Sequence, residues 1–458
     1  MAYFLFLLAN AALFVRPAEL FPALGNVQVY LYLIIAAIAA GVSGIWNQCR
    51  VDTLIQQPIN LCMLGFTASI ATSHLTNGAL SKAVEGEFEM VKVLLYFLML
   101  VSVVNSVPRL RQFLQLTVIC SSAMVLLSVI DYHDFVAEWS GRADLMAVRE
   151  VEKDLPDWIP KQLRHVTDQV GNTNDGLPIW VFRLRGLGMF HDPNDLASLA
   201  AVTAIISLYF LTDPLSPGIR FLWLAPLGLM THAVLMTHSR GGIMAFGVGC
   251  MAWLAVKYGG KVALLLGAMG AAAVPVVLGR QGNMEISGGT GQQRIQLWAD
   301  GLAQLKSMRL PFGIGESRYG EVAGLAAHNS YIHAYVELGF FGGTMFFGCF
   351  LFAAWAFYRI KREHIEILDP ELRRMMPYIA GMLAAWCTGM ATLSRCYVPP
   401  TYMIVGVAAA YINLAGFHRR KPQPVIALDS LVAQRWVMCS VGMLACCFAF
   451  VRVFARFG

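Results

Sequence analysis

The chain has 458 residues, of which 57% are hydrophobic and 14% are charged, and its mean hydropathy is +0.59. A soluble domain carries about 25% charged residues, so the composition excludes an ordinary soluble globular protein. The net charge of +6 comes from scattered basic residues without an aromatic-interleaved basic patch. No nucleic acid partner is therefore predicted.

Apolar segments recur along the whole chain, many of them near the roughly 20 residues that cross a bilayer as a helix. Backbone groups in lipid can pair only within their own segment, so these spans are expected to be helical. The first segment lacks a basic leading region and a cleavage site, and we expect it to be a span. The sequence predicts one all-α, polytopic membrane domain over 1–458, with about 12–13 transmembrane helices. The apolar segments are 2–15, 28–45, 58–74, 90–106, 113–130, 196–211, 221–237, 241–256, 262–279, 331–358, 376–394, 401–417 and 436–452.

The basic residues set the expected orientation. Short connections rich in Lys and Arg favour the cytoplasmic side, and the loops around 359–374 and 419–421 are the most basic ones. Alternation then places two long polar stretches, about 131–195 and 280–328, outside. Loops of this length without an apolar run are usually functional.

Two motifs enter helices from the outer side. In the first, Arg185 precedes Asp192 and Asn194, either of which can cap the following helix. Capping with interfacial anchoring is one interpretation, and binding of an anion by Arg185 at the helix start is the other. In the second, Arg240 stands between two apolar runs and before two glycines. It either extends to the interface or binds phosphate through its guanidinium group.

The second outer stretch carries two more motifs. Arg294 and Trp298 share a face if their segment is helical. His328, followed by Asn329, stands where the loop enters a helix, and an imidazole with an ordinary pKa of about 6.5 can accept a proton at neutral pH. Its other interpretation is a polar residue at a helix cap. Glu337 lies inside that helix and is expected to face the bundle or a water-filled cavity.

Several familiar chemistries are not predicted. The sequence lacks G-x-S-x-G, Walker A and H-E-x-x-H motifs. His333 lies at poor helical spacing from His328 for a shared metal ion. We therefore expect neither a metal site nor a cofactor.

Taken together, the motifs resemble the superfamily of O-antigen ligases, O-antigen polymerases and bacterial O-oligosaccharyltransferases. The resemblance covers roughly 180–345, and over the remaining chain only the helix count and loop placement agree. Its motifs are Arg185-Gly-x-Gly-x-Phe-x-Asp-Pro-Asn194-x-Leu-Ala, Ser239-Arg240-Gly-Gly, Arg294 with Trp298, Gly313-x-Gly315, His328-Asn329-x-Tyr331 and Glu337-x-Gly339.

The resemblance implies a C-type membrane glycosyltransferase in the bacterial inner (cytoplasmic) membrane, with its active site facing the periplasm. The implied donor is a glycan on undecaprenyl diphosphate, and the acceptor is a glycan, lipid-A-core or a protein. His328 would be the general base. Arg240 and Arg294, with Arg185 as a weaker candidate, would bind the diphosphate. Inversion at the anomeric carbon and independence from metal ions are expected.

Other functions remain open from the sequence. A transporter or flippase of lipid-linked or anionic solutes also places charge within a membrane, although its polar residues need a path to both sides. A scaffold in cell-envelope assembly would not need the arginines and the histidine. Within the enzyme class, the motifs do not separate ligase, polymerase and protein O-glycosylation.

Overall fold

The computed structural model describes residues 1–17, 27–139, 166–172, 178–214, 216–268 and 290–455. The chain divides into two compact units. Unit 1 comprises Met1–Ala37, Arg111–Cys250 and Ala384–Gly389, and unit 2 comprises Ile38–Leu110, Met251–Leu383 and Met390–Gly458. Each unit is described by itself below.

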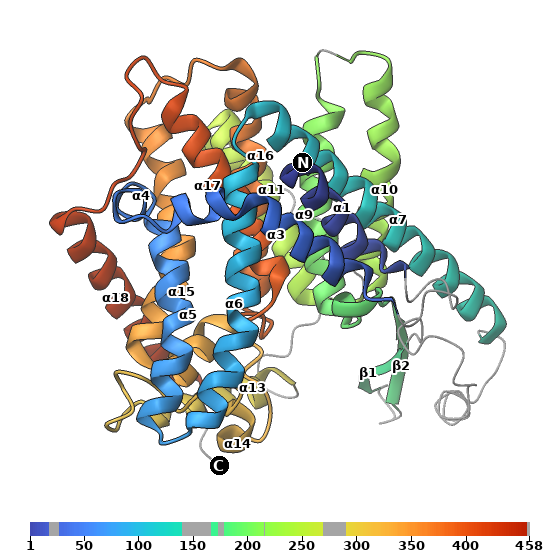
Figure 1. The fold of residues 1–458 in the computed structure, drawn as a ribbon. Helices are drawn as coiled ribbons and strands as arrows, with labels where there is room; N and C mark the ends of the chain where they lie inside the picture. The colour runs from blue at the N-terminus through green and yellow to red at the C-terminus, as the bar shows by residue number, and fades with distance from the viewer. Residues whose placement is uncertain (18–26, 140–165, 173–177, 215, 269–289, 456–458) are drawn as a thin grey trace. The chain divides into compact units, whose positions relative to one another are not determined.

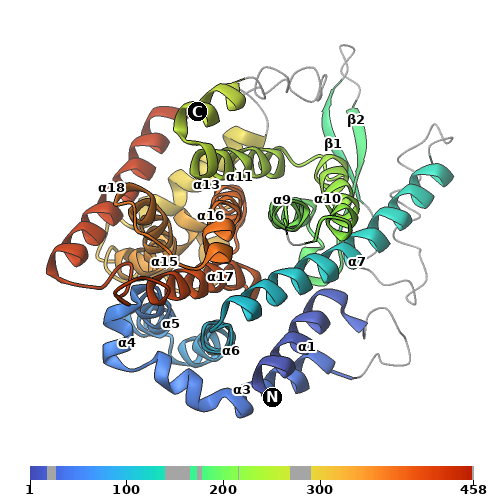
Figure 2. The same ribbon diagram turned by 90° about the horizontal axis from the view of Figure 1, so that it is seen from above.

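Unit 1 is built around α9 (Pro193–Leu211), whose residues are almost all buried. The helix begins at Asp192, whose carboxylate accepts a hydrogen bond from the backbone N–H of Asn194, and Pro193 occupies its first position. It packs against α10 (Leu224–Met236) and the 3₁₀ turns η3 (Gly188–Phe190) and η4 (Ile219–Trp223). Figure 2 shows α9 and α10 side by side. The unit also holds α1 (Ala2–Val15) and a two-stranded antiparallel sheet of β1 (Val166–Asn172) and β2 (Pro178–Arg183).

Unit 2 is built around α15 (Ser330–Arg362), which packs against α5 (Pro58–Thr76), α17 (Pro399–Phe417) and α18 (Ser430–Phe454). α5 in turn packs against α6, and α6 against α17. Figure 1 shows α5 and α15 running next to each other. Asn329 caps the start of α15, and Asp429 caps α18. The unit also contains α4 (Val51–Gln56), α6 (Leu80–Val103), α13 (Thr290–Gln304) and α14 (Tyr319–Ala323).

Four helices run from one unit into the other along the chain. They are α3 (Val29–Gln48), α7 (Val107–Trp139), α11 (Arg240–Tyr258) and α16 (Pro370–Met390). The helix α7 continues to Trp139. It thus extends into the stretch 131–195 that the sequence assigns to the outer side, and that assignment stays a prediction. The strands β1 and β2 also lie within this stretch, which the sequence did not predict.

The prediction of an all-α polytopic membrane protein is confirmed. Among the described residues, eight helices are long and apolar enough to cross a membrane. The segments at 2–15, 58–74, 90–106 and 376–394 are also helical but are shorter or less apolar than those eight. The segment at 262–279 lies partly outside the described residues, so the predicted total of about 12–13 spans stays a prediction. The eight are Val29–Gln48, Val107–His133, Pro193–Leu211, Ile219–Met236, Arg240–Tyr258, Ser330–Arg362, Pro399–Phe417 and Ser430–Phe454.

The helix α15 is interrupted at Gly339, where φ is 68° and ψ is −167°. The break removes helical partners from nearby backbone groups. The preceding segment 310–315 replaces them: Ile314 N–H donates to the Val336 carbonyl (3.1 Å) and Phe340 N–H donates to the Leu310 carbonyl (2.7 Å). Irregular backbone at membrane depth is tolerated when it is buried in protein in this way.

Gly313 explains why the motif Gly313-x-Gly315 occurs here. Its φ is +75°, and a Cβ on it would lie 2.3 Å from the Glu337 carbonyl oxygen. Only glycine allows the loop to approach the interrupted helix this closely. This motif therefore has a structural role in the pairing of 310–315 with α15.

Candidate functional site

The predicted site residues are divided between the two units. Arg185, Asn194 and Arg240 belong to unit 1. Unit 2 holds the others, namely Arg294, Trp298, His328, Asn329 and Glu337. Arg240 and Asn194 lie at helix starts, and His328 and Asn329 directly precede α15. Trp298 and Glu337 lie inside α13 and α15.

In unit 1, Asn194 connects two segments that are distant in sequence. Its Oδ1 accepts hydrogen bonds from Ser239 Oγ (2.7 Å) and from Arg183 Nη2 (3.0 Å). Arg183 also donates to the Thr237 carbonyl (2.8 Å). Ser239 Oγ in turn accepts from the Gly242 N–H (3.0 Å) at the start of α11. Arg183, which sequence reasoning did not select as a site residue, thus organises the backbone before Arg240.

Arg240 is the first residue of α11, and its side chain is exposed. Among the residues that the structure describes, none forms a hydrogen bond or ion pair with its guanidinium group. Gly242, the second of the two glycines after Arg240, allows α9 to approach the backbone closely. The Cβ of Ala197 of α9 would lie 2.2 Å from a Cβ on Gly242. Close packing of α9 with α11 holds Arg240 at this helix end.

Arg185 is half-buried, and its Nη1 lies 2.8 Å from His191 Nε2. Asp192, one of the two residues expected to cap the next helix, is the cap. Asn194 instead holds Ser239 and Arg183. Arg185 thus contacts His191, whereas Asn194 contacts Ser239 and Arg183, and the two side chains share none of these partners.

Replacing Asn194 with alanine is expected to destabilise the protein by about 1–3 kcal/mol, because the buried Ser239 hydroxyl and the half-buried Arg183 guanidinium lose an acceptor. The apparent Tm of the purified protein in detergent measures this loss. Asn47→Ala is the control, because Asn47 is exposed on α3 and its change should stay within about 0.5 kcal/mol. Equal Tm values for both variants would contradict the role given to Asn194.

In unit 2, α13 presents Arg294 and Trp298 one turn apart, which confirms the expectation that a helix brings them to one face. Trp298 Nε1 donates to the Ala327 carbonyl (2.6 Å). Ile295 and Leu302, on the buried side, join a core with Leu444 and Val451 of α18. Packing of α13 thus brings Trp298 to the residue that precedes His328.

His328 is half-buried and adopts the left-handed backbone conformation, with φ at 48°. Its N–H donates to Ser394 Oγ (2.9 Å) in the loop between α16 and α17. Asn329 is the cap of α15, since its Oδ1 accepts from the N–H groups of Tyr331 (3.1 Å) and Ile332 (3.2 Å). His328 therefore stands just before the cap and is held on both sides.

Glu337 faces the bundle, one of the two positions expected for it, and its side chain is 0% exposed. Its Oε2 accepts from the Tyr397 hydroxyl (2.8 Å). Its Oε1 accepts from the Tyr319 N–H (2.9 Å) and lies 3.0 Å from His333 Nε2. Through these contacts Glu337 joins α15 to the start of α14 and to the loop that carries Tyr397. The sequence did not predict Tyr397 as its partner.

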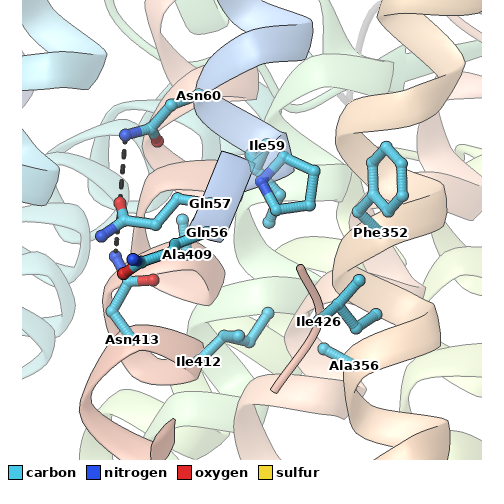
Figure 3. A pocket seen from close by; sticks show the side chains of 11 residues that line it. Gln56, Gln57, Ile59, Asn60, Phe352, Ala356, Ala409, Ile412, Asn413 and Ile426 are labelled. Carbon is cyan, nitrogen blue, oxygen red and sulfur yellow. Dashed lines mark hydrogen bonds between the residues drawn. The ribbon is translucent and has the colours of Figure 1, made fainter. Parts of the chain in front are cut away.

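A small pocket in unit 2 lies near the far end of α15, about seven turns beyond His328. Gln57 Oε1 accepts from Asn60 (3.1 Å) and from Asn413 (3.0 Å) there, as Figure 3 shows. The described lining consists of amides and apolar side chains, without an acid, a base or a thiol. No predicted site residue lines this cavity.

A comparison with protein families indicates the class of protein to which this chain is similar. The family model described as O-antigen ligase matches residues 225–347. Residues 225–347 are thus similar to the O-antigen ligase family. The predicted resemblance to the O-antigen ligase and polymerase superfamily is thereby confirmed, and the domain indicates a glycosyltransferase of that kind in a multi-pass membrane protein. A comparison with curated proteins finds no match.

The range matched by the O-antigen ligase model contains six of the eight predicted site residues. Arg185 and Asn194 precede it. The helices α11, α13 and α14 lie within the matched range, as does the first half of α15 with its break at Gly339. The six residues inside this range are Arg240, Arg294, Trp298, His328, Asn329 and Glu337.

Proposed function

We propose that this protein transfers a glycan from an undecaprenyl-diphosphate carrier to an acceptor hydroxyl at the periplasmic face of the bacterial inner membrane. His328 acts as general base. Arg294 and Arg240 bind the donor diphosphate, and Arg185 is a weaker candidate for the same role. A ligase-like reaction is slightly favoured over polymerisation or protein O-glycosylation.

The observation that carries the proposal is the placement of His328 inside the O-antigen ligase domain. It lies at a helix entrance, half-buried, with its backbone held by Ser394 and its neighbour Ala327 held by Trp298. A general base needs a fixed position and access to the substrate. Arg294 stands one turn before Trp298 on the helix that contacts this segment.

The proposed reaction is a single displacement. The acceptor oxygen bonds to the anomeric carbon while the bond from that carbon to the diphosphate oxygen breaks. The hydroxyl proton passes to the unprotonated imidazole of His328, and undecaprenyl diphosphate leaves with the bonding electrons. Guanidinium groups stabilise the charge that develops on the leaving group. Attack opposite the diphosphate inverts the anomeric centre, and a product with retained configuration would contradict this step.

The experiment that tests the function uses the purified protein in liposomes with a short glycan on undecaprenyl diphosphate. Lipid-A-core, a second lipid-linked glycan and a pilin-like peptide are offered separately as acceptors. Release of undecaprenyl diphosphate with one acceptor establishes a transferase. The acceptor that works shows whether the reaction is ligation, polymerisation or protein O-glycosylation. Movement of the intact donor across the bilayer without any product would favour a flippase.

Arg240→Ala and Arg294→Ala are each expected to lower kcat/KM for the donor about 100-fold to 1000-fold, because stabilisation of the leaving diphosphate is lost. The lysine variants should recover only part of the rate, since an ammonium group lacks the bidentate geometry. Initial rates in the liposome assay measure both effects. Arg420→Ala is the control, because Arg420 is 80% exposed and pairs with Glu366. Wild-type rates in both alanine variants would refute the assignment of these arginines.

A further inference from the structure

The loop between α16 and α17, residues 391–398, is joined to the segment that carries His328. The His328 N–H donates to Ser394 Oγ (2.9 Å). Ser330 Oγ donates to the Leu393 carbonyl (2.6 Å) and accepts from the Arg395 N–H (2.8 Å). A serine of each segment therefore bonds to the backbone of the other.

His328 needs this support because of its backbone conformation. A left-handed φ in a residue other than glycine costs about 1–2 kcal/mol and persists only when the surroundings enforce it. Trp298 fixes the carbonyl before His328, and Asn329 caps the helix after it. Ser394 contributes the contact to the N–H of His328 itself.

The same loop is fixed at its other end by Glu337. The Tyr397 hydroxyl donates a hydrogen bond to Glu337 Oε2 (2.8 Å), and the Tyr397 ring stacks on Phe66 with ring centroids 5.8 Å apart. Burial raises the pKa of Tyr397 well above its ordinary value, so the hydroxyl keeps its proton at neutral pH. Glu337 follows His328 by about two and a half helical turns. The loop is thus bonded to the chain at two places, directly before α15 through Ser394 and within the first half of α15 through Tyr397.

We infer that Ser394 and Tyr397 are positioning residues for the general base. Ser394 holds the backbone of His328 directly, and Tyr397 holds the loop that carries Ser394 through its bond to Glu337. The inference rests on the proposed function, in which His328 takes the acceptor proton. A shift of about 1 Å in such a group can cost about 100-fold in rate.

Two measurements on Ser394→Ala and Tyr397→Phe test the inference. Hydrogen–deuterium exchange of the peptide covering 327–332 reports the support of His328 without any need for activity. Each variant is expected to exchange about fivefold faster there, which is the effect of one lost hydrogen bond. In the transfer assay kcat should fall about tenfold or more with the KM for the donor nearly unchanged. Ser394→Thr, which keeps the hydroxyl group, should restore both values.

Tyr335→Phe is the matched control. Tyr335 lies on the same half of α15 and is buried, and its hydroxyl bonds to Ser440 Oγ (2.7 Å) on α18. Its loss should lower the apparent Tm while exchange at 327–332 and kcat stay at wild-type values. Unchanged exchange in Ser394→Ala and Tyr397→Phe, or equal effects in Tyr335→Phe, would overturn the inference. Wild-type protein without transferase activity would instead refute the proposed function. The exchange data would still show whether Ser394 and Tyr397 hold the backbone of His328.

Discussion

His328→Ala is expected to lower kcat about 100-fold to 10,000-fold, because general base catalysis by a positioned side chain contributes a factor of this size. The donor should still bind, since the diphosphate is assigned to arginines. Single-turnover rates at saturating donor and acceptor measure the chemical step. His328→Asn should lose activity equally while folding well, because asparagine tolerates the left-handed conformation that His328 adopts.

His364→Ala is the control for this experiment. His364 follows the other end of α15, is exposed, and has the same left-handed backbone, with φ at 49°. Its replacement removes an imidazole and imposes the same backbone demand on alanine, and the transfer rate should not change. A transfer rate in His328→Asn equal to that of the wild type would show that another group accepts the proton.

Gly339→Ala is expected to be the most damaging single substitution to the fold, destabilising it by about 4 kcal/mol or more. The φ of 68° and ψ of −167° lie in a region that only glycine adopts readily. A Cβ would also meet backbone atoms, at 2.4 Å from Phe312 N and 2.5 Å from Gly313 N. Backbone cannot rotate away as a side chain does, so the pairing of 310–315 with α15 must separate. The yield of monodisperse protein in detergent and its apparent Tm measure the effect.

Gly442→Ala is the matched control within α18. No heavy atom lies within 4 Å of a Cβ placed there, and alanine in a helix is favoured over glycine by about 0.5–1 kcal/mol. The Gly442→Ala protein should therefore be at least as stable as the wild type. A Gly339→Ala protein with the same Tm would show that the interruption in α15 is not required.

The sequence predicted the helices well because apolar length is a local property. The segment predicted at 331–358 corresponds to α15, but its break at Gly339 was not predicted. The apolar run continues through the break, and the partners of the freed backbone groups come from Leu310–Gly315 earlier in the chain. The strands β1 and β2 were not predicted either. The stretch that contains them was assessed only by its polarity, whereas the strands form because their backbone groups pair with each other.

For the site, local spacing was informative and tertiary contacts were not predictable. The face shared by Arg294 and Trp298 followed from helical periodicity. The contact from Trp298 to Ala327 did not, because it joins a helix to a loop. Ser394 was not predicted as a site residue, since nothing in its local sequence indicates that its hydroxyl would bond to His328. The roles of these residues in catalysis stay proposals.

The most direct test of the central claim asks whether the protein makes a new glycosidic bond. Sealed liposomes with the purified wild-type chain receive a labelled glycan on undecaprenyl diphosphate and an acceptor, and products are separated by mass spectrometry. The account predicts one undecaprenyl diphosphate released for each glycan joined to the acceptor, with an inverted anomeric centre and no product in His328→Ala. Labelled donor that crosses the bilayer and stays intact with every acceptor would contradict it.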